Sequence, residues 1–283
     1  SLGYKGMVYV DGSLRNDWIS ALAGTNHSSI LYPSIGASAI LTNMFTMKSN
    51  ILSYAKVRLS YSEVGNAPER FRAITTYAVL GGLNTTSYFP IKDLKPERTH
   101  SWEGGFNLGL FDNKLTPDVT AYKTYTENQL FSPEISTTTG YSKLYVNAGK
   151  VTNKGIELAL GFKQNIGPVD WKITLLWSLN RNRIDQLLPE YTNEELGVTV
   201  HLDEMDVYSL GGAKQRLTVG GSMGDVYVNT MRTDEHGHIW MNSMTGTLET
   251  DKNNYVYAGN TNPKYTLSWR NEFNWKGISL GFM

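Results

Sequence analysis

Residues 171–182 have the sequence WKITLLWSLNRN, and the alternation within this stretch decides the fold class. Its odd positions are apolar: Trp171, Ile173, Leu175, Trp177 and Leu179. Its even positions are mostly polar: Lys172, Thr174, Leu176, Ser178, Asn180 and Asn182. Successive side chains of a β-strand point to opposite faces, so a period of two predicts a strand with one apolar and one polar face.

The same period of two recurs along the chain. Apolar faces are formed by Tyr265, Leu267, Trp269, Phe273 and Trp275, by Trp102, Phe106, Leu108 and Leu110, by Ile156, Leu158, Leu160 and Phe162, and by Val57, Leu59 and Tyr61. We predict about nine or ten strands, over residues 3–15, 31–42, 54–64, 99–111, 115–127, 154–164, 169–182, 217–232, 263–275 and 277 onward. Most of them approach or exceed the roughly 9–11 residues of a tilted membrane-crossing strand. They exceed the roughly 5–6 residues common in soluble sheets, so the pattern favours an antiparallel transmembrane β-barrel over a half-solvated soluble sheet.

The connections between these strands alternate in length. Short turns are predicted at Phe111–Lys114, Gln164–Pro168 and Asn274–Gly277, and long polar segments at about 64–99, 128–154 and 185–214. Outer-membrane barrels have short periplasmic turns and long extracellular loops. We therefore expect the short turns inside the cell envelope and the long loops in the medium. Substrate recognition is expected in the loops, about 66–98, 128–147 and 185–262, and in polar residues of the lumen.

The alternation also predicts which side chains contact lipid. We expect eight to point outward: Trp102, Phe106, Leu108, Ile173, Leu175, Trp177, Leu267 and Trp269. Five should point into the lumen: Lys172, Thr174, Ser178, Arg270 and Glu272. Arg181 and Arg183 follow an apolar face where the strand leaves the hydrocarbon, so we interpret them as rim charges at the bilayer surface.

Composition excludes several classes of protein. The 283 residues contain 26 Lys plus Arg and 26 Asp plus Glu, so no net charge drives binding to nucleic acid. There is no cysteine, which excludes disulfides and thiolate chemistry within the sequence. No apolar run approaches the 18 or so residues of a transmembrane helix. The sequence begins at Ser1 and stops inside a predicted strand, so we expect a fragment whose outer strands pair with segments beyond it.

Two motifs suggest chemistry, and both have a simpler explanation. Gly220–Gly224 matches the G-x-S-x-G nucleophile elbow, but a β-favouring run follows Ser222 where the elbow needs a helix, so we predict a bend. Asp234–His238 carries ligand-type side chains, but Gly237 predicts a hairpin turn, and histidines two apart on a strand point to opposite faces. His27, His100 and His201 are scattered, with no carboxylate spacing that marks an acid–base group. We predict no catalytic, cofactor or metal site, and the sequence identifies no substrate-binding residue.

Four stretches resemble signatures of SusC/RagA-type TonB-dependent outer-membrane transporters. Residues 59–66, LSYSEVGN, are similar to the R-x-S-Y-G-x-V-G-N strand end, and Leu94–Thr99 with Trp102–Phe106 resemble L-K-P-E-x-T-x-S-x-E-x-G. Residues 147–158 are similar to N-A-G-x-x-x-N-K-G-I-E-L, and residues 179–184 resemble S-x-N-R-N-K-V. Within residues 147–158, Asn147, Asn153 and two glycines suit a loop that returns to a strand, with Gly155 allowing close backbone approach. The matches occur in the family's order over nearly the whole chain.

The resemblance implies that residues 1–283 are about 9–10 strands of a 22-stranded barrel with a plugged lumen. It also implies import of a bulky glycan or oligopeptide without catalysis, driven through TonB, and multi-pass location in the bacterial outer membrane. The expected partners are a SusD-like surface lipoprotein, the TonB complex and membrane lipid, with a dimer of transporter–lipoprotein pairs as one arrangement. The plug, the N-terminal domain and the final strands are expected outside the chain. Two alternatives stay open: a secreted β-rich protein that binds or cleaves glycans, and a passive porin.

Overall fold

The computed structural model describes residues 1–45, 49–70, 72, 77–79, 83–85, 88–89 and 93–283. The chain forms two compact units. The first comprises residues 1–147, 152–181 and 264–283, and the second comprises residues 148–151 and 182–263. Among the described residues, no helix is both long enough and apolar enough to cross a membrane.

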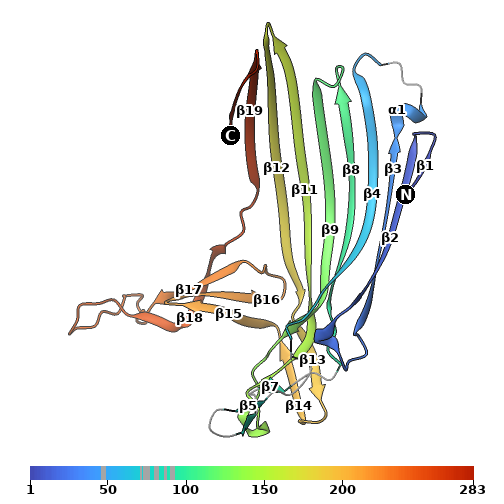
Figure 1. Cartoon of the computed structure of the whole chain (residues 1–283). Coiled ribbons are helices and arrows are strands. Elements are labelled where there is room, and N and C mark those ends of the chain that lie inside the picture. Colours follow the sequence, from blue (N-terminus) through green and yellow to red (C-terminus); the bar gives the residue numbers. More distant parts are fainter. Residues whose placement is uncertain (46–48, 71, 73–76, 80–82, 86–87, 90–92) are drawn as a thin grey trace. The chain divides into compact units, whose positions relative to one another are not determined.

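The first unit is built on a ten-stranded sheet whose long strands lie side by side in Figure 1. In spatial order the strands are β1 (Leu2–Tyr4), β2 (Val8–Trp18), β3 (Ser29–Ile40), β4 (Leu52–Asn66), β8 (Glu97–Leu110), β9 (Leu115–Phe131), β11 (Val146–Ile166), β12 (Val169–Gln186), β19 (Thr266–Trp275) and β20 (Ile278–Phe282). This sheet confirms the predicted all-β class and the predicted number of strands. Short elements lie between the long strands: α1 (Leu41–Met44), β5 (Tyr77–Val79), β6 (Leu83–Thr85), β7 (Tyr88–Phe89), β10 (Lys143–Leu144) and two 3₁₀ turns, Ser20–Leu22 and Thr137–Thr139.

The strand registers confirm that the sheet has two chemically different faces. Leu175 lies opposite Trp269, and Trp177 lies opposite Leu267. The alternate pairs form the polar face, as in Lys172 opposite Glu272 and Ser178 opposite Thr266, with Leu176 opposite Ser268 as the one apolar exception among these β12 positions. The same division holds on β4, β8 and β9, where Val57, Phe106 and Val119 are aligned. The residues expected outward and those expected in the lumen therefore fall on opposite faces of the sheet.

The apolar face is exposed over much of the unit. Exposed fractions are 60% for Leu267, 59% for Leu59 and 51% for Trp102. A water-soluble domain rarely leaves so extensive an apolar face uncovered. Contact of this face with lipid is the interpretation that fits its chemistry, and it stays a prediction here.

The short turns lie where the sequence predicts them. Phe111, Asp112 and Asn113 have positive φ angles of 53°, 56° and 60° between β8 and β9. Lys276 and Gly277, with φ of 45° and 87°, join β19 to β20. Two successive positive φ angles give the hairpin turn whose twist matches that of the strands.

Three of the predicted elements differ from the structure in number, in sheet or in type. The predicted strand 3–15 is two strands, because Lys5 and Gly6 take positive φ angles of 49° and 66° and reverse the chain between β1 and β2. Residues 217–232 do not join the large sheet, because they pair within the second unit. Residues 147–153 are not a loop, since β11 begins at Val146.

The second unit covers a segment in which we expected a long polar loop, 185–214, followed by an irregular strand, 217–232. Its main element is an antiparallel sheet of β15 (Glu204–Leu210), β16 (Ala213–Thr218), β17 (Asp225–Met231) and β18 (Thr250–Asn260). A separate hairpin joins β13 (Leu188–Asn193) to β14 (Val198–Leu202). Hydrogen bonds from Arg216 and Lys214 hold the pKa of the Asp206 carboxyl below its usual value. Much of this polar segment is therefore ordered by strand pairing and ion pairs.

Candidate functional site

A charged network crosses three strands on the polar face of the large sheet. Arg58 on β4 donates from Nη2 to Asp118 Oδ1 of β9 at 2.7 Å and also to the Thr120 hydroxyl. Its Nη1 donates to the Asn107 side chain of β8, whose amide in turn donates to Asp118. Because Asp118 neutralises Arg58 and two neutral side chains accept further hydrogen bonds from its guanidinium, the network is a preorganised polar surface.

Gly105 allows this network to form. The register places Gly105 of β8 between Arg58 of β4 and Thr120 of β9. A Cβ at this position would lie 3.1 Å from the guanidinium of Arg58 and 2.5 Å from the carbonyl oxygen of Val119. The missing side chain lets the arginine extend across β8 and reach β9.

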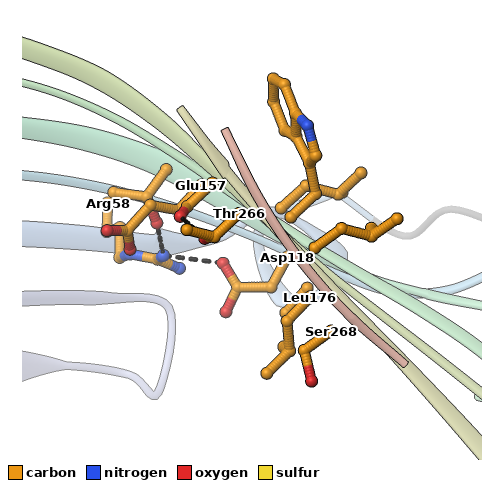
Figure 2. Close-up of a pocket in the computed structure, with 12 residues that line it drawn as sticks. Arg58, Asp118, Glu157, Leu176, Thr266 and Ser268 are labelled. Carbon is orange, nitrogen blue, oxygen red and sulfur yellow. Dashed lines mark hydrogen bonds and ion pairs between the residues drawn. The ribbon is translucent and has the colours of Figure 1, made fainter. Parts of the chain in front are cut away.

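A hollow of about 510 Å³ lies on the same face, beside this network. Figure 2 shows the Arg58–Asp118 pair near Glu157, with Leu176, Thr266 and Ser268 from the neighbouring strands. The Ser178 and Thr266 hydroxyls are 2.6 Å apart. Leu176 is 48% exposed although it occupies the polar face. The hollow therefore combines charged groups, hydroxyls and apolar residues, as solute-binding sites commonly do.

Asn147 joins three chain segments at the loop end of the sheet. Its amide donates to the carbonyl oxygens of Lys95 at 2.9 Å and Asn128 at 3.0 Å. Its Oδ1 accepts from the Lys95 backbone amide at 2.7 Å. Leu94, the residue before Lys95, is fully buried in a small cluster with Leu22, Ile30 and Tyr32. Two stretches that carried the family resemblance, at residues 94–99 and 147–158, are thus bonded to each other.

An arginine–tyrosine stack lies in the same loops. The rings of Tyr88 and Tyr145 are stacked with centroids 5.1 Å apart, and the guanidinium of Arg72 lies 4.9 Å from the Tyr145 ring centroid. Burial raises the pKa of the Tyr145 hydroxyl, and a hydrogen bond to Glu69 raises the pKa of Arg72. At exposed sites such cation–π contacts are each worth about 0.5–1 kcal/mol. The stack therefore helps to order the loops above the sheet.

Carboxylates lie beside the three scattered histidines. His100 has Nε2 at 3.5 Å from Glu127 Oε1 and Nδ1 at 3.9 Å from Glu63 Oε2. His27 Nε2 lies 3.3 Å from Asp93 Oδ2, and His201 Nε2 lies 3.0 Å from Asp203 Oδ2. Glu63 and Glu127 come from the adjacent strands β4 and β9, so no local spacing in the sequence marks them as neighbours of His100. Among the described residues, no group of three or more His, Asp or Glu side chains could hold a metal ion.

The two suggestive motifs are structural. Ser222 lies in a bend before β17, where its hydroxyl donates to Asn182 Oδ1 at 3.2 Å. Asp234 accepts backbone N–H groups from His236 and His238 in the predicted hairpin turn, where Gly237 has a φ of 84°. These hydrogen bonds, led by His238, lower the pKa of Asp234. The prediction that the two histidines point to opposite faces is wrong: the centroids of their rings lie only 6.1 Å apart, because the segment is a turn and not a continuous strand.

Arg181 and Arg183 each contact another group in the described part of the chain. Arg181 donates from Nη1 to the carbonyl oxygen of Lys264 at 3.0 Å. Arg183 has Nε at 3.7 Å from Asp185 Oδ1. Their position relative to a bilayer stays a prediction.

Comparison with known proteins gives the family. The model of the TonB-dependent receptor-like β-barrel matches residues 4–281, so the chain belongs to the TonB-dependent receptor β-barrel family. It is 29% identical to TonB-dependent receptor P39 of Formosa agariphila over 201 residues, covering 66% of this chain and 19% of that protein. It is 24% identical to TonB-dependent receptor SusC of Bacteroides thetaiotaomicron over 234 residues, covering 73% and 22%. The chain thus spans under a third of the length of these curated relatives.

Solved structures give the same fold. The RagAB peptide importer in its open-open state aligns with a TM-score of 0.77 at 21% identity, covering 99% of this chain and 30% of that chain. A second structure, of the RagAB peptide transporter, aligns with a TM-score of 0.71 at 22% identity, covering 99% and 31%. The predicted resemblance to SusC/RagA-type transporters and the barrel-fragment class are confirmed.

Proposed function

We propose that this chain is part of the barrel wall of a TonB-dependent outer-membrane importer of the SusC/RagA type. The solute is a bulky nutrient, either a glycan or an oligopeptide. The observation that carries the proposal is the two-faced sheet, whose exposed apolar face suits lipid and whose polar face carries the Arg58 network and the hollow. The family match and the likeness to SusC and to the RagAB peptide importer support it.

The chain contributes no catalysis in this proposal. Ser222 and Asp234 stabilise turns, and the Arg58 guanidinium is already engaged by a carboxylate. Recognition comes instead from the polar face and from the loops that Asn147 joins. The likeness to SusC and RagAB supports a SusD-like surface lipoprotein as the partner at this loop end. Energy would come from the TonB complex, through parts of the protein beyond these residues.

The test removes one loop and leaves the sheet intact. Residues 132–142, between β9 and β10, are replaced by a short Gly-Ser linker in the full-length transporter. The host is grown on a panel of glycans and peptides, and we expect it to stop growing on the nutrient that this transporter imports. Alternatively, the surface lipoprotein should no longer co-purify with the transporter. The barrel should still shift on unboiled gels, which shows that it folds.

Ser222→Ala and His236→Ala are the matched controls. Both lie in turns of the second unit, so both should leave growth and lipoprotein binding unchanged. If Ser222→Ala alone abolished growth or hydrolysis of an ester or peptide bond, an enzyme would replace the importer. Unaltered growth and unaltered lipoprotein binding after the loop replacement would also contradict the proposal.

A further inference from the structure

We propose that the hollow on the polar face binds an organic cation of the transported solute, the ammonium or guanidinium of a lysine- or arginine-like group, with Glu157 as its counter-charge. The inference rests on the proposed function, which makes this face the inner wall of the barrel. It adds to that function the charge of one group on the solute.

The charges around the hollow are unbalanced. Three charged side chains line it: Arg58, Asp118 and Glu157. Arg58 is held by Asp118 at 2.7 Å and by two neutral acceptors on β8 and β9. Glu157 is exposed, and none of the ion pairs found among the described residues involves it. The hollow therefore carries one unneutralised negative charge.

The remaining lining specifies more than the charge. Leu176 is 48% exposed on a face that is otherwise polar, and Ala159 lies on the strand beside it. An aliphatic stem can cover such a surface while its charged end stays in a polar environment. Thr266 and Ser268 line the hollow from β19, where Ser268 is paired with Leu176, and their hydroxyls can accept hydrogen bonds from an ammonium or a guanidinium.

These features together select the ligand class. An anionic solute would meet an uncompensated carboxylate, and a fully polar neutral solute would leave the Leu176 side chain without an apolar partner. A cation on an aliphatic stem satisfies both the carboxylate and the leucine. Lysine and arginine side chains have this chemistry.

The test uses a thiol as a charge reporter. The 283 residues contain no cysteine, so Ser268→Cys introduces a single thiol into the hollow with little change in shape. In the full-length transporter in outer-membrane vesicles, the modification rate is measured with trimethylammonium-ethyl methanethiosulfonate, a cation, and with sulfonatoethyl methanethiosulfonate, an anion. The ratio of the cationic to the anionic rate is divided by the same ratio measured for a small thiol in solution. The result reports the local charge, because thiol ionisation affects both rates equally and cancels.

We expect the cationic reagent to be favoured by about threefold, and Glu157→Gln to abolish that preference. Glu272→Gln is the matched control, because Glu272 lies on the same face of the same strand as Ser268 but is paired with Arg270 at 2.5 Å and Lys172 at 3.6 Å. It should leave most of the preference intact. A ratio that does not respond to Glu157→Gln would overturn the assignment.

A second experiment tests whether the cation belongs to the solute or to the protein itself. N-acetyl-Ala-Lys-Ala-amide, whose only charge is the lysine ammonium, should slow modification of the reporter, and its Nε-acetyl form should not. If neither peptide protects the thiol and Glu157→Gln speeds both reagents equally, a cation of the same protein occupies the hollow and the solute assignment is wrong. If neither reagent reacts at all, another part of the protein covers the hollow, and the solute assignment is wrong although the barrel wall stands.

Discussion

The pair Leu175 and Leu176 tests which face of the sheet contacts lipid. The two leucines are adjacent on β12, but the register places Leu175 beside Trp269 and Leu176 beside Ser268. Arginine is introduced at each position in turn. Because the residue removed and the residue added are the same, the comparison isolates the face of the sheet.

The expected cost follows from the depth of the residue. Leu175 lies six residues after Val169, where β12 begins at a short turn. At a rise of about 3.3 Å per residue and a tilt of about 40°, it lies roughly 15 Å above that turn. The apolar band of such barrels is about 25 Å tall, so Leu175 lies close to its midplane. Arginine there costs about 2–4 kcal/mol, which is a roughly 30- to 900-fold shift in the folding equilibrium.

Leu176→Arg should cost under about 1 kcal/mol, because its side chain enters the hollow near the Glu157 carboxylate. The assay is urea unfolding of the barrel in phospholipid bilayers, followed by tryptophan emission and by the mobility shift on unboiled gels. The reasoning is refuted if Leu176→Arg is the more destabilising variant, since the polar face would then contact lipid. Equal costs would mean that neither face is buried in hydrocarbon.

Three further predictions concern single contacts. Asn147→Ala should raise the protease sensitivity of the joined loops by about tenfold or more, because each backbone group left without its partner costs about 1–3 kcal/mol; unchanged digestion would contradict the junction. Gly155→Ala should destabilise the barrel by about 1–3 kcal/mol in urea unfolding, because its Cβ would collide with the Tyr122 ring and lie 2.6 Å from the Leu179 carbonyl oxygen. Gly36→Ala is the control and should cost under about 0.5 kcal/mol, because the nearest atom to its Cβ lies at 3.8 Å; similar costs would show that close packing does not select glycine at position 155. Asp206 has a lowered folded-state pKa, so its contribution to stability is present above the ordinary carboxyl value of 3.8 and is lost as pH falls through the lowered pKa. Pepsin digestion of the second unit at falling pH should show this loss, and Asp206→Asn should remove it; a profile that the substitution leaves unchanged would exclude Arg216 pairing as the cause.

Much of the large sheet could be predicted because each strand records its own two faces. The alternation in residues 171–179 determines which side chains share a face, whatever the strand pairs with. The turns at Phe111–Lys114 and Lys276–Gly277 were also predictable, since turn chemistry is local. The break at Lys5–Gly6 was missed because the apolar alternation on both sides of it hides a short hairpin.

The second unit could not be predicted as a folded sheet. Its strands β15, β16 and β17 have only six or seven residues each. Lys214, Asp206 and Arg216 become partners only when β15 pairs with β16. The segment has the sequence pattern of a polar loop, but it folds into the ordered sheet β15–β18. Pairing between strands, and not hydrophobicity along one strand, decides its structure.

The sequence by itself determined the two-faced strands, the short turns and the family, because each depends on residues that are near one another in the chain. Only the tertiary structure brought Arg58, Asp118 and Glu157 to one hollow, and joined Asn147 to Lys95 and Asn128. The physical reason is that neighbouring strands place side chains in contact although up to about a hundred residues separate them, as in Trp171 and Asn271. Register between strands sets those contacts, and register is a property of the whole sheet.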